Sequence, residues 1–343
     1  MTTKKKASYI VVIAVVIIVA LTILNLSVQL FARKSSSSLI PSLQSGTSRA
    51  VKNPWNPATI VPVHAPAATL GTYRYVSNTE AVFDYAAAVE GCPTPQNALI
   101  GILTIPTAKA TARRMILRET YRRLNNALIP TQKLDIKFVF GQPVAGQDSE
   151  DAKAIAAEKL LFSEDMVVLD TWENMDEGKT YNWFKYARKE LLYTVHPIDS
   201  KKLCPRYRAI GKSDDDTLIH ITRLSKELGK LDPYALNFIG RWTDNEFMTG
   251  MLHFLSPPLV EYVSTSNSIA KKISGYADRC TLKWLLDSKL EWNIVSYREN
   301  FIAFVDIPGW FAGFMTENTL CLHGTKDSTT LYRAMLELYN SDG

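Results

Sequence analysis

Acidic side chains are missing from the first 34 residues, and no charged side chain of either sign occurs from Ala7 to Ala32. An apolar helix of this length can cross the hydrocarbon core of a bilayer, which is about 30 Å thick. Three lysines, Lys4–Lys6, precede the stretch and two basic residues follow it, so we predict that the N-terminus stays in the cytoplasm. A cleaved signal peptide fits less well, because the apolar run is long and no small-residue cleavage site follows it.

The rest of the chain lacks any charge imbalance, and this limits its partners. Five of the 39 basic residues lie within the first 34 residues, so the remaining 309 residues carry 34 basic and 34 acidic side chains. No basic stripe, zinc-knuckle spacing or aromatic RNA-binding motif occurs in them. The sequence therefore predicts no nucleic-acid partner, and the high pI reflects the N-terminus alone.

Cysteine is also scarce, with four residues: Cys92, Cys204, Cys280 and Cys321. Their spacing does not resemble a zinc site. All four follow the apolar stretch, so we expect them in an oxidising lumen, where an even number allows two disulfides in three connectivities. Serine and proline are concentrated between residues 33 and 95, which favours an extended stem with one short helix over residues 79–90.

These features divide the chain into four segments. We predict a cytoplasmic tail over residues 1–6, a transmembrane signal anchor over 7–32, a lumenal stem over 33–95 and a globular domain over 96–343. The predicted topology is that of a single-pass type II membrane protein.

In the globular domain, short apolar runs alternate with amphipathic segments. The pattern predicts strands over residues 98–105, 136–140, 166–169 and 207–210, and helices over 111–124, 150–162, 179–193 and 217–229. Such alternation predicts βαβ units around a mostly parallel central sheet, so the expected fold class is α/β. From residue 229 to Trp310 the pattern is less regular, and a final helix is expected over 331–339.

Three adjacent carboxylates, Asp214, Asp215 and Asp216, follow the last of these strands. Ligands of α/β sheets bind outside the carboxyl ends of the strands. Neighbouring carboxylates repel one another, and a divalent cation such as Mn²⁺ or Mg²⁺ neutralises them while it is shared with substrate phosphates. The alternative is an acidic first turn of the helix predicted at residue 217. The triplet alone does not decide between the two.

Six segments in a fixed order carry a resemblance to a known family. They are Arg113–Tyr121 (RRMILRETY), Phe138–Gly141 (FVFG), Leu169–Thr180 (with LDTWEN and KT), Cys204–Asp216 (with C, Y, K and DDD), Thr249–Ser256 and the pair Ala277-Asp278. Together they resemble the β1,3-galactosyltransferase family, glycosyltransferase family 31, which also contains β1,3-N-acetylglucosaminyltransferases and fringe-like enzymes.

The sequence departs from the family pattern at several positions. Ala277 replaces the first residue of the family's acidic pair, and Leu282 replaces a glycine. Tyr121 and Trp172 are aromatic substitutions, and the segment 243–250 has lost its glycine-rich form. The donor side of the site is therefore better supported than the acceptor side.

The resemblance implies a GT-A-like nucleotide-sugar-binding fold and a metal-dependent, inverting transferase. Such an enzyme would move a hexose, with galactose as the leading candidate, from a UDP-sugar onto a glycan of a glycoprotein or glycolipid in a β1,3 linkage. The cofactor would be Mn²⁺ or Mg²⁺, and the protein would lie in the Golgi membrane with its catalytic domain in the lumen.

Three alternatives remain beside this interpretation. UDP-N-acetylglucosamine is the alternative donor. An inactive relative that acts as a chaperone or scaffold is favoured by Ala277 and opposed by the intact aspartate triplet. A metal-dependent phosphoesterase would need clustered His and Asp ligands for two metals, which the sequence lacks.

We expect Asp214, Asp216 and His323 to be the metal ligands, with Asp214 and Asp215 also beside the donor. Histidine is a common metal ligand, and His323 near the C-terminus is the best candidate to complete an acidic site of this kind. The alternative is an ordinary surface histidine.

Arg113, Arg114 and Arg118 follow the first strand at the expected nucleotide edge, and arginine forks pair well with phosphate. The alternative is a solvated basic helix face. Lys212 is a further candidate for the donor diphosphate, and it can equally pair with the aspartates; both interpretations stay open.

By resemblance, Asp278 is the general base that takes the proton of the acceptor hydroxyl. The alternative is a loop aspartate beside Arg279. Trp242 is a candidate for a sugar-stacking platform, although tryptophan is more often a core residue. A disulfide from Cys204 to Cys280 would tie the aspartate strand to this base, although the sequence does not determine the connectivity.

Overall fold

The computed structural model describes residues 73–76, 91–197, 203–243, 247–288, 290–297, 304–306 and 318–340. These residues belong to one compact unit, Ala67–Gly343. The predicted membrane anchor over 7–32, the predicted helix over 79–90 and Trp310 lie outside the described residues. No helix among the described residues is long and apolar enough to cross a membrane.

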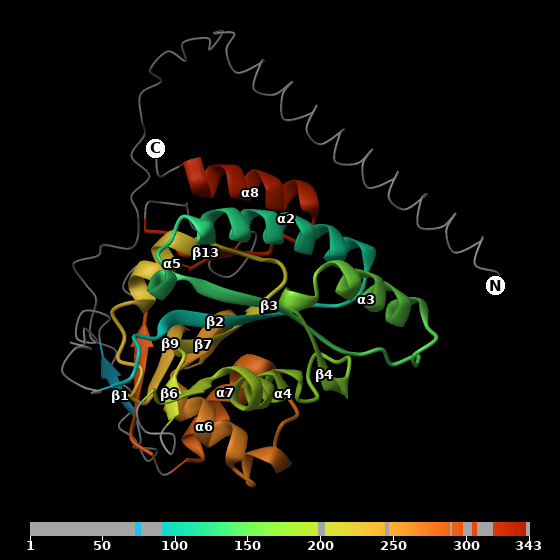
Figure 1. Cartoon of the computed structure of the whole chain (residues 1–343). Helices are drawn as coiled ribbons and strands as arrows, with labels where there is room; N and C mark the ends of the chain where they lie inside the picture. The colour runs from blue at the N-terminus through green and yellow to red at the C-terminus, as the bar shows by residue number, and fades with distance from the viewer. Residues whose placement is uncertain are drawn as a thin grey trace, which may run out of the picture. The chain divides into compact units, whose positions relative to one another are not determined.

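Strands and helices alternate along most of this unit (Figure 1). The strands are β1 (Tyr73–Val76), β2 (Gln96–Leu103), β3 (Leu134–Gln142), β4 (Met166–Trp172), β5 (Tyr193–Val195), β6 (Leu203–Pro205), β7 (Tyr207–Asp214), β8 (Thr217–Ile219), β9 (Asn237–Trp242), β10 (Met248–Leu255), β11 (Trp292–Ser296), β12 (Phe304–Asp306) and β13 (Cys321–His323). The α-helices are α2 (Ala108–Asn126), α3 (Glu150–Leu161), α4 (Lys179–Tyr186), α5 (Ile221–Leu228), α6 (Pro257–Thr265), α7 (Ala277–Leu286) and α8 (Ser328–Asn340). Short 3₁₀ turns cover Pro130–Gln132, Ser163–Asp165 and Ile269–Lys271, and a π-helical turn covers Ala187–Leu191.

The central sheet has eight strands in the order β1-β11-β9-β10-β7-β2-β3-β4. Every neighbouring pair is parallel except the two pairs that β10 makes with β9 and β7. The mostly parallel α/β sheet predicted from the sequence is confirmed. Its first strand, β1, comes from the segment interpreted as a stem, so the sheet begins before residue 96.

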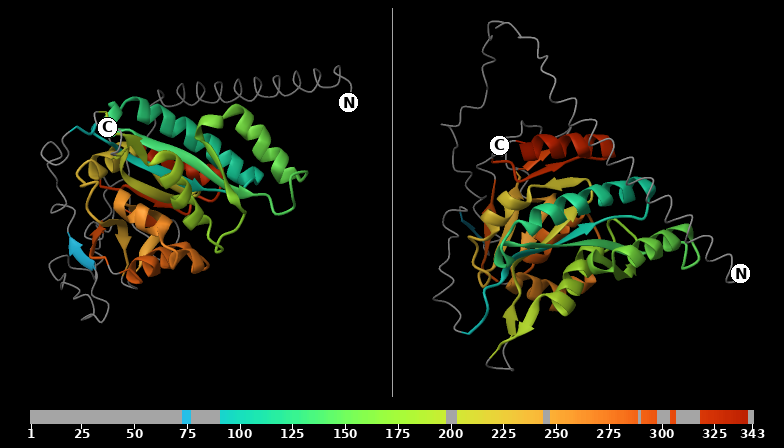
Figure 2. Two further views of the ribbon diagram at one scale, coloured as in Figure 1. Left: turned by 60° about the horizontal axis from the view of Figure 1, so that its bottom comes forward. Right: turned by 45° about the horizontal axis from the view of Figure 1, so that its top comes forward.

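Helices cover both faces of this sheet because successive strand side chains point to opposite faces. In β2, Ala98 and Ile100 share a buried cluster with Leu117 of α2, whereas Leu99 shares a second cluster with Trp183 of α4. Figure 2 shows the same arrangement from other directions, with α8 beside α2 and with α6 and α7 across the sheet. The near-continuous apolar runs of β2 and β7 follow from burial on both faces.

One predicted element is wrong, and it lies beside the aspartates. Residues Thr217–Gly229 do not form one helix, because Thr217–Ile219 form strand β8 and the helix α5 begins only at Ile221. β8 pairs with β13, which together with β12 makes a separate three-stranded sheet. His220 caps α5 by accepting a hydrogen bond from Arg223 N at 3.4 Å. The aspartate triplet is therefore not the first turn of a helix.

Two further segments differ from the prediction. The helix expected over residues 179–193 ends at Tyr186 and continues only as the π-helical turn, after which β5 begins. The region after Gly229 is more regular than expected, because it contributes β9, β10 and β11 to the central sheet.

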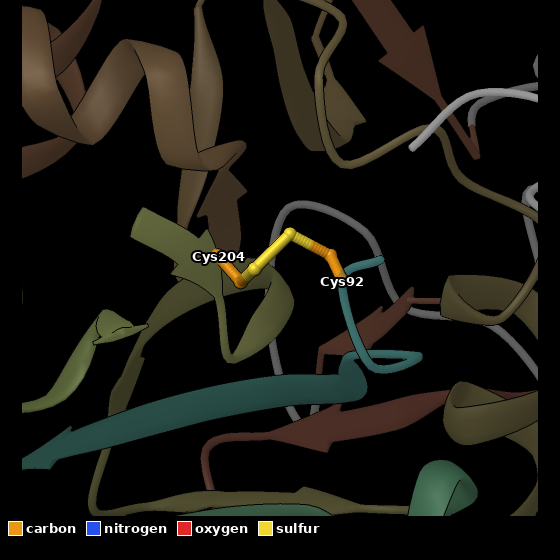
Figure 3. Close-up of a disulfide and its surroundings, with 2 residues drawn as sticks. All are labelled: Cys92 and Cys204. Atoms are coloured by element: carbon orange, nitrogen blue, oxygen red, sulfur yellow. A yellow bond between two sulfur atoms is a disulfide. The ribbon is translucent and has the colours of Figure 1, made fainter. Parts of the chain in front are cut away.

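A disulfide joins Cys92, just before β2, to Cys204 in β6, with their Cα atoms 5.7 Å apart (Figure 3). At least one disulfide was expected, but the suggested Cys204–Cys280 pair is wrong. Cys280 is buried on α7, where its Sγ donates to the main-chain oxygen of Ser274 at 3.3 Å. Cys321 is buried within β13 and takes no part in this bond. The bridge therefore anchors the entry to β2 beside β7, rather than tying the aspartates to Asp278.

Candidate active site

Asp214, Asp216 and His323, the three predicted metal ligands, lie together at the carboxyl end of β7. Asp214 ends β7, Asp216 precedes β8 and His323 ends β13. β13 runs antiparallel to β8 with His323 opposite Thr217, so this register puts the imidazole beside the aspartates. His323 Nε2 lies 3.3 Å from Asp216 Oδ1 and 4.0 Å from Asp214 Oδ2.

The three side chains fit a divalent cation. One ligand atom from each lies within 4.8 Å of the other two. Ligands that are about 2.1 Å from one octahedral ion lie about 3 to 4.2 Å from each other, which matches both distances to His323. Two carboxylates and one imidazole suit Mn²⁺ or Mg²⁺. All three side chains are partly exposed, so substrate oxygens can reach the same ion.

Asp216 is held in its charged form. Burial by itself would raise the pKa of Asp216. The hydrogen bond and charge of His323, followed by the charges of Arg113 and Lys326, outweigh burial and lower this pKa. A metal ligand has to be deprotonated, and a bound cation would take the place of the His323 proton beside this carboxylate.

Asp215 has different partners from its two neighbours. Its Oδ2 accepts a hydrogen bond from Thr104 Oγ1 at 2.6 Å, and its Oδ1 pairs with Arg113 Nη2 at 2.7 Å. Arg113 Nε also donates to the main-chain oxygen of Asp215 at 3.2 Å. These bonds make Asp215 the residue that anchors the aspartate turn to β2 and α2.

Arg114 and Arg118 form ion pairs with carboxylates of the protein itself. All five N–H groups of Arg114 donate, to Glu158, Thr104, Ile105 and Thr111. Arg118 pairs with Glu158 and Asp165. The guanidinium of Arg114 thus has no donor left for a nucleotide, and in this structure both arginines hold α2 against α3.

Lys212 also bonds within the protein, which was one of its two open interpretations. Its ammonium group donates to Asp214 Oδ1 and, at 2.6 Å, to the main-chain oxygen of Gly250. His253 lies opposite Lys212 in the β7–β10 pair. Burial, and then the charge of Lys212, lower the pKa of His253 to about 3. Lys212 is therefore the positive group here, beside a neutral imidazole.

Asp278, the predicted base, lies in the first turn of α7 beside Gly250 of β10. A Cβ atom placed on Gly250 would lie 3.6 Å from Asp278 Cβ and 3.6 Å from Lys212 Nζ. Gly250 thus lies between Asp278 and Lys212, and Lys212 itself contacts Asp214. Asp278 Oδ1 accepts a hydrogen bond from Arg279 N at 2.8 Å, and the residue is half-buried.

The exposed aromatic residues are not those expected from the sequence. Trp242 is only 8% exposed, whereas Trp172 is 59% and Tyr276 is 68% exposed. The loop after Trp172 pairs with the loop before α7, because Glu177 bridges to Ser274. Gly275 N also donates to the main-chain oxygen of Asp176 at 2.6 Å, next to the exposed Tyr276. Exposed residues therefore lie on both of these paired loops, and Tyr276 is two residues before Asp278.

Several residues that organise the site were missed. Thr104 follows β2, the strand beside β7, so the rule that sites form at carboxyl ends of strands was the available signal. Lys179 donates to the main-chain oxygen of Thr104 at 2.7 Å and pairs with Glu173. Burial lowers the pKa of Lys179, although Glu173 acts in the opposite direction. No sequence signal pointed to Thr325, which donates twice to the main-chain oxygen of Asp216.

One comparison with known proteins covers most of the residues described above. The sequence model described as galactosyltransferase matches residues 112–278, which include Arg113, the aspartate triplet and Asp278, but not His323. No match was found among curated proteins. With this α/β fold and this motif set, the chain is a glycosyltransferase. Over residues 112–278 it matches the galactosyltransferase family, in agreement with the resemblance found in the sequence.

Solved structures show a more distant likeness. The galactosyltransferase LgtC in complex with donor and acceptor sugar analogues is 10% identical, with a TM-score of 0.36, over 71% of this chain and 95% of that chain. An active-site mutant of LgtC is 10% identical over the same shares, with a TM-score of 0.34.

Proposed function

We propose that the protein is a metal-dependent inverting transferase with a GT-A-like fold. It moves a hexose from a UDP-sugar onto the hydroxyl of a glycan acceptor in a β1,3 linkage, with galactose as the leading donor sugar. The observation that carries the proposal is the convergence of Asp214, Asp216 and His323 at the carboxyl end of β7, inside a chain of this family. In this arrangement His323, which lies near the C-terminus in the sequence, is next to the aspartate triplet.

Asp214, Asp216 and His323 would hold Mn²⁺ or Mg²⁺. The ion supplies positive charge to the diphosphate as the sugar leaves. Lys212 fixes Asp214, and Arg113 with Thr104 fixes Asp215, so the turn keeps its shape when phosphate arrives.

Asp278 would take the proton of the acceptor hydroxyl. The acceptor oxygen then forms its bond to the anomeric carbon on the face opposite the departing UDP. The bond from the anomeric carbon to the phosphate oxygen breaks, and UDP keeps its electron pair. The position of Asp278 across Gly250 from Lys212, which bonds to Asp214, supports this assignment of sides.

The acceptor would bind over an exposed rim, defined here as Trp172, Met175 and Tyr276 on the two paired loops, with Tyr276 two residues before Asp278. Aromatic rings supply apolar faces with polar edges, which suits the mixed surface of a pyranose. Burial of Trp242 speaks against the platform suggested from the sequence.

We also propose the four-segment organisation of the chain, with a tail over residues 1–6, an anchor over 7–32, a stem over 33–95 and a catalytic domain over 96–343, to whose sheet the stem residues Tyr73–Val76 add strand β1. The uncharged stretch and the lysines before it support a type II protein of the Golgi membrane.

The test is turnover by the full chain purified in detergent. UDP-galactose and UDP-N-acetylglucosamine are each offered with methyl galactoside or methyl mannoside, with Mn²⁺ or with EDTA. We expect Mn²⁺-dependent release of UDP that requires the acceptor. If only UDP-N-acetylglucosamine supports transfer, then the donor is UDP-N-acetylglucosamine and not UDP-galactose. Absence of turnover with every pair would favour the inactive scaffold that Ala277 suggests.

A further inference from the structure

The segment that follows His323 is bonded to the aspartate turn by its own hydrogen bonds. Thr325 donates to the main-chain oxygen of Asp216 from its N–H at 3.0 Å and from its Oγ1 at 2.7 Å. Thr325 is fully buried, although it lies 109 residues from Asp216 in the sequence. Gly324, with φ of +88°, makes the turn between His323 and Thr325.

Arg113 makes a second connection between the same two segments. Its Nη1 donates to the main-chain oxygen of Lys326 at 2.8 Å. Its Nε and Nη2 donate to the main chain and side chain of Asp215 at 3.2 and 2.7 Å. One buried guanidinium from α2 thus holds both the aspartate turn and the segment after His323.

These bonds matter because the strand pair that carries His323 is short. β13 pairs over only three residues with β8 on one side and with β12 on the other, and His323 is the last residue of β13 in both ladders. The pairing by itself leaves the imidazole at the fraying end of a ladder. Thr325 and Arg113 continue the attachment beyond that end, so they limit how far His323 can move from Asp216.

We propose that Thr325 and Arg113 are positioning residues that set the metal affinity of the site by locking the segment after His323 onto the aspartate turn. This inference rests on the proposed function, in which Asp214, Asp216 and His323 bind a divalent cation. Neither Thr325 nor Arg113 is among the three residues that would hold the ion. They reduce the ordering that metal binding has to accomplish, which is how residues behind metal ligands raise affinity.

The experiment measures Mn²⁺ binding to the full chain in detergent, without any UDP-sugar, from the electron paramagnetic resonance signal of unbound Mn²⁺. Thr325→Val keeps the shape of the side chain and removes the hydroxyl donor, and Thr325→Ser keeps the donor. We expect the Kd for Mn²⁺ to rise about tenfold in Thr325→Val and to stay near the wild-type value in Thr325→Ser. Arg113→Lys, which cannot reproduce the three directed hydrogen bonds, should also raise the Kd.

Thr120→Val is the matched control. It removes a hydroxyl that donates to the main-chain oxygen of Ile116 at 2.8 Å and to Met335 Sδ at 2.9 Å, and to none of the aspartates. It should leave the Kd unchanged, and thermal unfolding should show all variants folded. Wild-type affinity in Thr325→Val would overturn the positioning role while leaving the metal site in place. Absence of Mn²⁺ binding by the wild-type chain would instead remove the metal site, and the proposed function with it.

Discussion

Three consecutive aspartates take two different roles because their partners differ. Asp214 and Asp216 lie beside His323, whereas both oxygens of Asp215 are occupied by Arg113 and Thr104. Local repulsion among three carboxylates is thus relieved in two ways, by an internal arginine and by the proposed cation. The substitution of each aspartate should therefore have a different consequence.

Asp216→Asn should lower turnover by at least a hundredfold while leaving the protein folded. Asparagine keeps the size and one oxygen but loses the charge that holds the cation, and metal-assisted stabilisation is worth several kcal/mol, with about 1.4 kcal/mol per factor of ten. Turnover across a Mn²⁺ titration, with thermal unfolding as the control, is the measurement. Near-normal turnover by a folded Asp216→Asn protein would mean that the triplet is not the metal site.

Glu158→Gln should destabilise the protein by roughly 3–5 kcal/mol, because it leaves the buried Arg114 without a charged partner and removes one of the two carboxylates of Arg118. At about 2–4 °C per kcal/mol, the unfolding midpoint should fall by roughly 6–20 °C. Glu150→Gln is the matched control, since Glu150 pairs with Lys153 at the surface with 90% of its side chain exposed. Equal midpoints for the two variants would contradict the structural role of Glu158.

The same carboxylate should contribute to acid unfolding. Burial opposes ionisation of Glu158, but the hydrogen bonds and charges of Arg114 and Arg118 outweigh it and lower its pKa. A group with a lowered folded-state pKa stabilises the protein above its unfolded value, about pH 4.3, and loses this contribution as the pH falls through the folded value. Glu158→Gln should therefore weaken the loss of stability below about pH 4.3.

At the scale of elements, the rim beside Asp278 comes from two loops held together by main-chain bonds. The loop after β4 carries Trp172 and Met175, and the loop before α7 carries Tyr276. Rim residues this exposed add little to the core, so their replacement should affect binding more than folding.

Trp172→Ala and Tyr276→Ala should each raise the KM for the acceptor about three- to tenfold, because loss of an aromatic contact removes about 0.5–1.5 kcal/mol. The KM for the UDP-sugar and the affinity for Mn²⁺ should not change. Steady-state kinetics with each substrate varied in turn separates the two effects. Tyr332→Ala on α8, which removes another aromatic ring that is 45% exposed, is the control. An unchanged acceptor KM in both rim variants would place the acceptor elsewhere.

At the scale of the whole chain, one covalent bond closes a long loop. Cys92→Ser should lower stability by about 2–5 kcal/mol, since the bond to Cys204 spans 112 residues and restricts the unfolded chain. Peptide mapping without reduction should recover a Cys92–Cys204 peptide, with Cys280 and Cys321 alkylated as thiols. Cys280→Ser, which keeps a donor toward Ser274, should cost far less. A mapped Cys204–Cys280 bond would refute the observed connectivity.

The N-terminal anchor predicts a definite topology. A tag placed after Gly343 should be protected from protease in intact microsomes and should become accessible after detergent is added. The reason is that Lys4–Lys6 precede the uncharged stretch and keep the N-terminus in the cytoplasm. Digestion of the tag in sealed microsomes would reject the type II arrangement.

Most of the first half of the fold could be predicted because its signals are local. The strands β2, β3, β4 and β7 and the helices α2 and α3 appear where short apolar runs and amphipathic segments alternate. β8 was not predicted, because three residues are too few to show a periodicity. These residues form a strand only because they pair with β13, which is distant in the sequence. Strands β9, β10 and β11 were not predicted, because aromatic and turn-forming residues in this region obscured the alternation of strands and helices.

The sequence by itself determined the family motifs, the α/β alternation up to Gly229 and the types of side chain available for a metal, because each depends on residues close together in the chain. Only the tertiary structure decided which of them meet. The register of β13 against β8 places His323 beside Asp216. The packing of α2 on α3 allows Arg114 to form an ion pair with Glu158. Likewise, the position of β6 brings Cys204 close enough to Cys92 to form the disulfide. Each of these pairings joins residues tens to more than a hundred positions apart, and burial and strand register select them rather than any local preference.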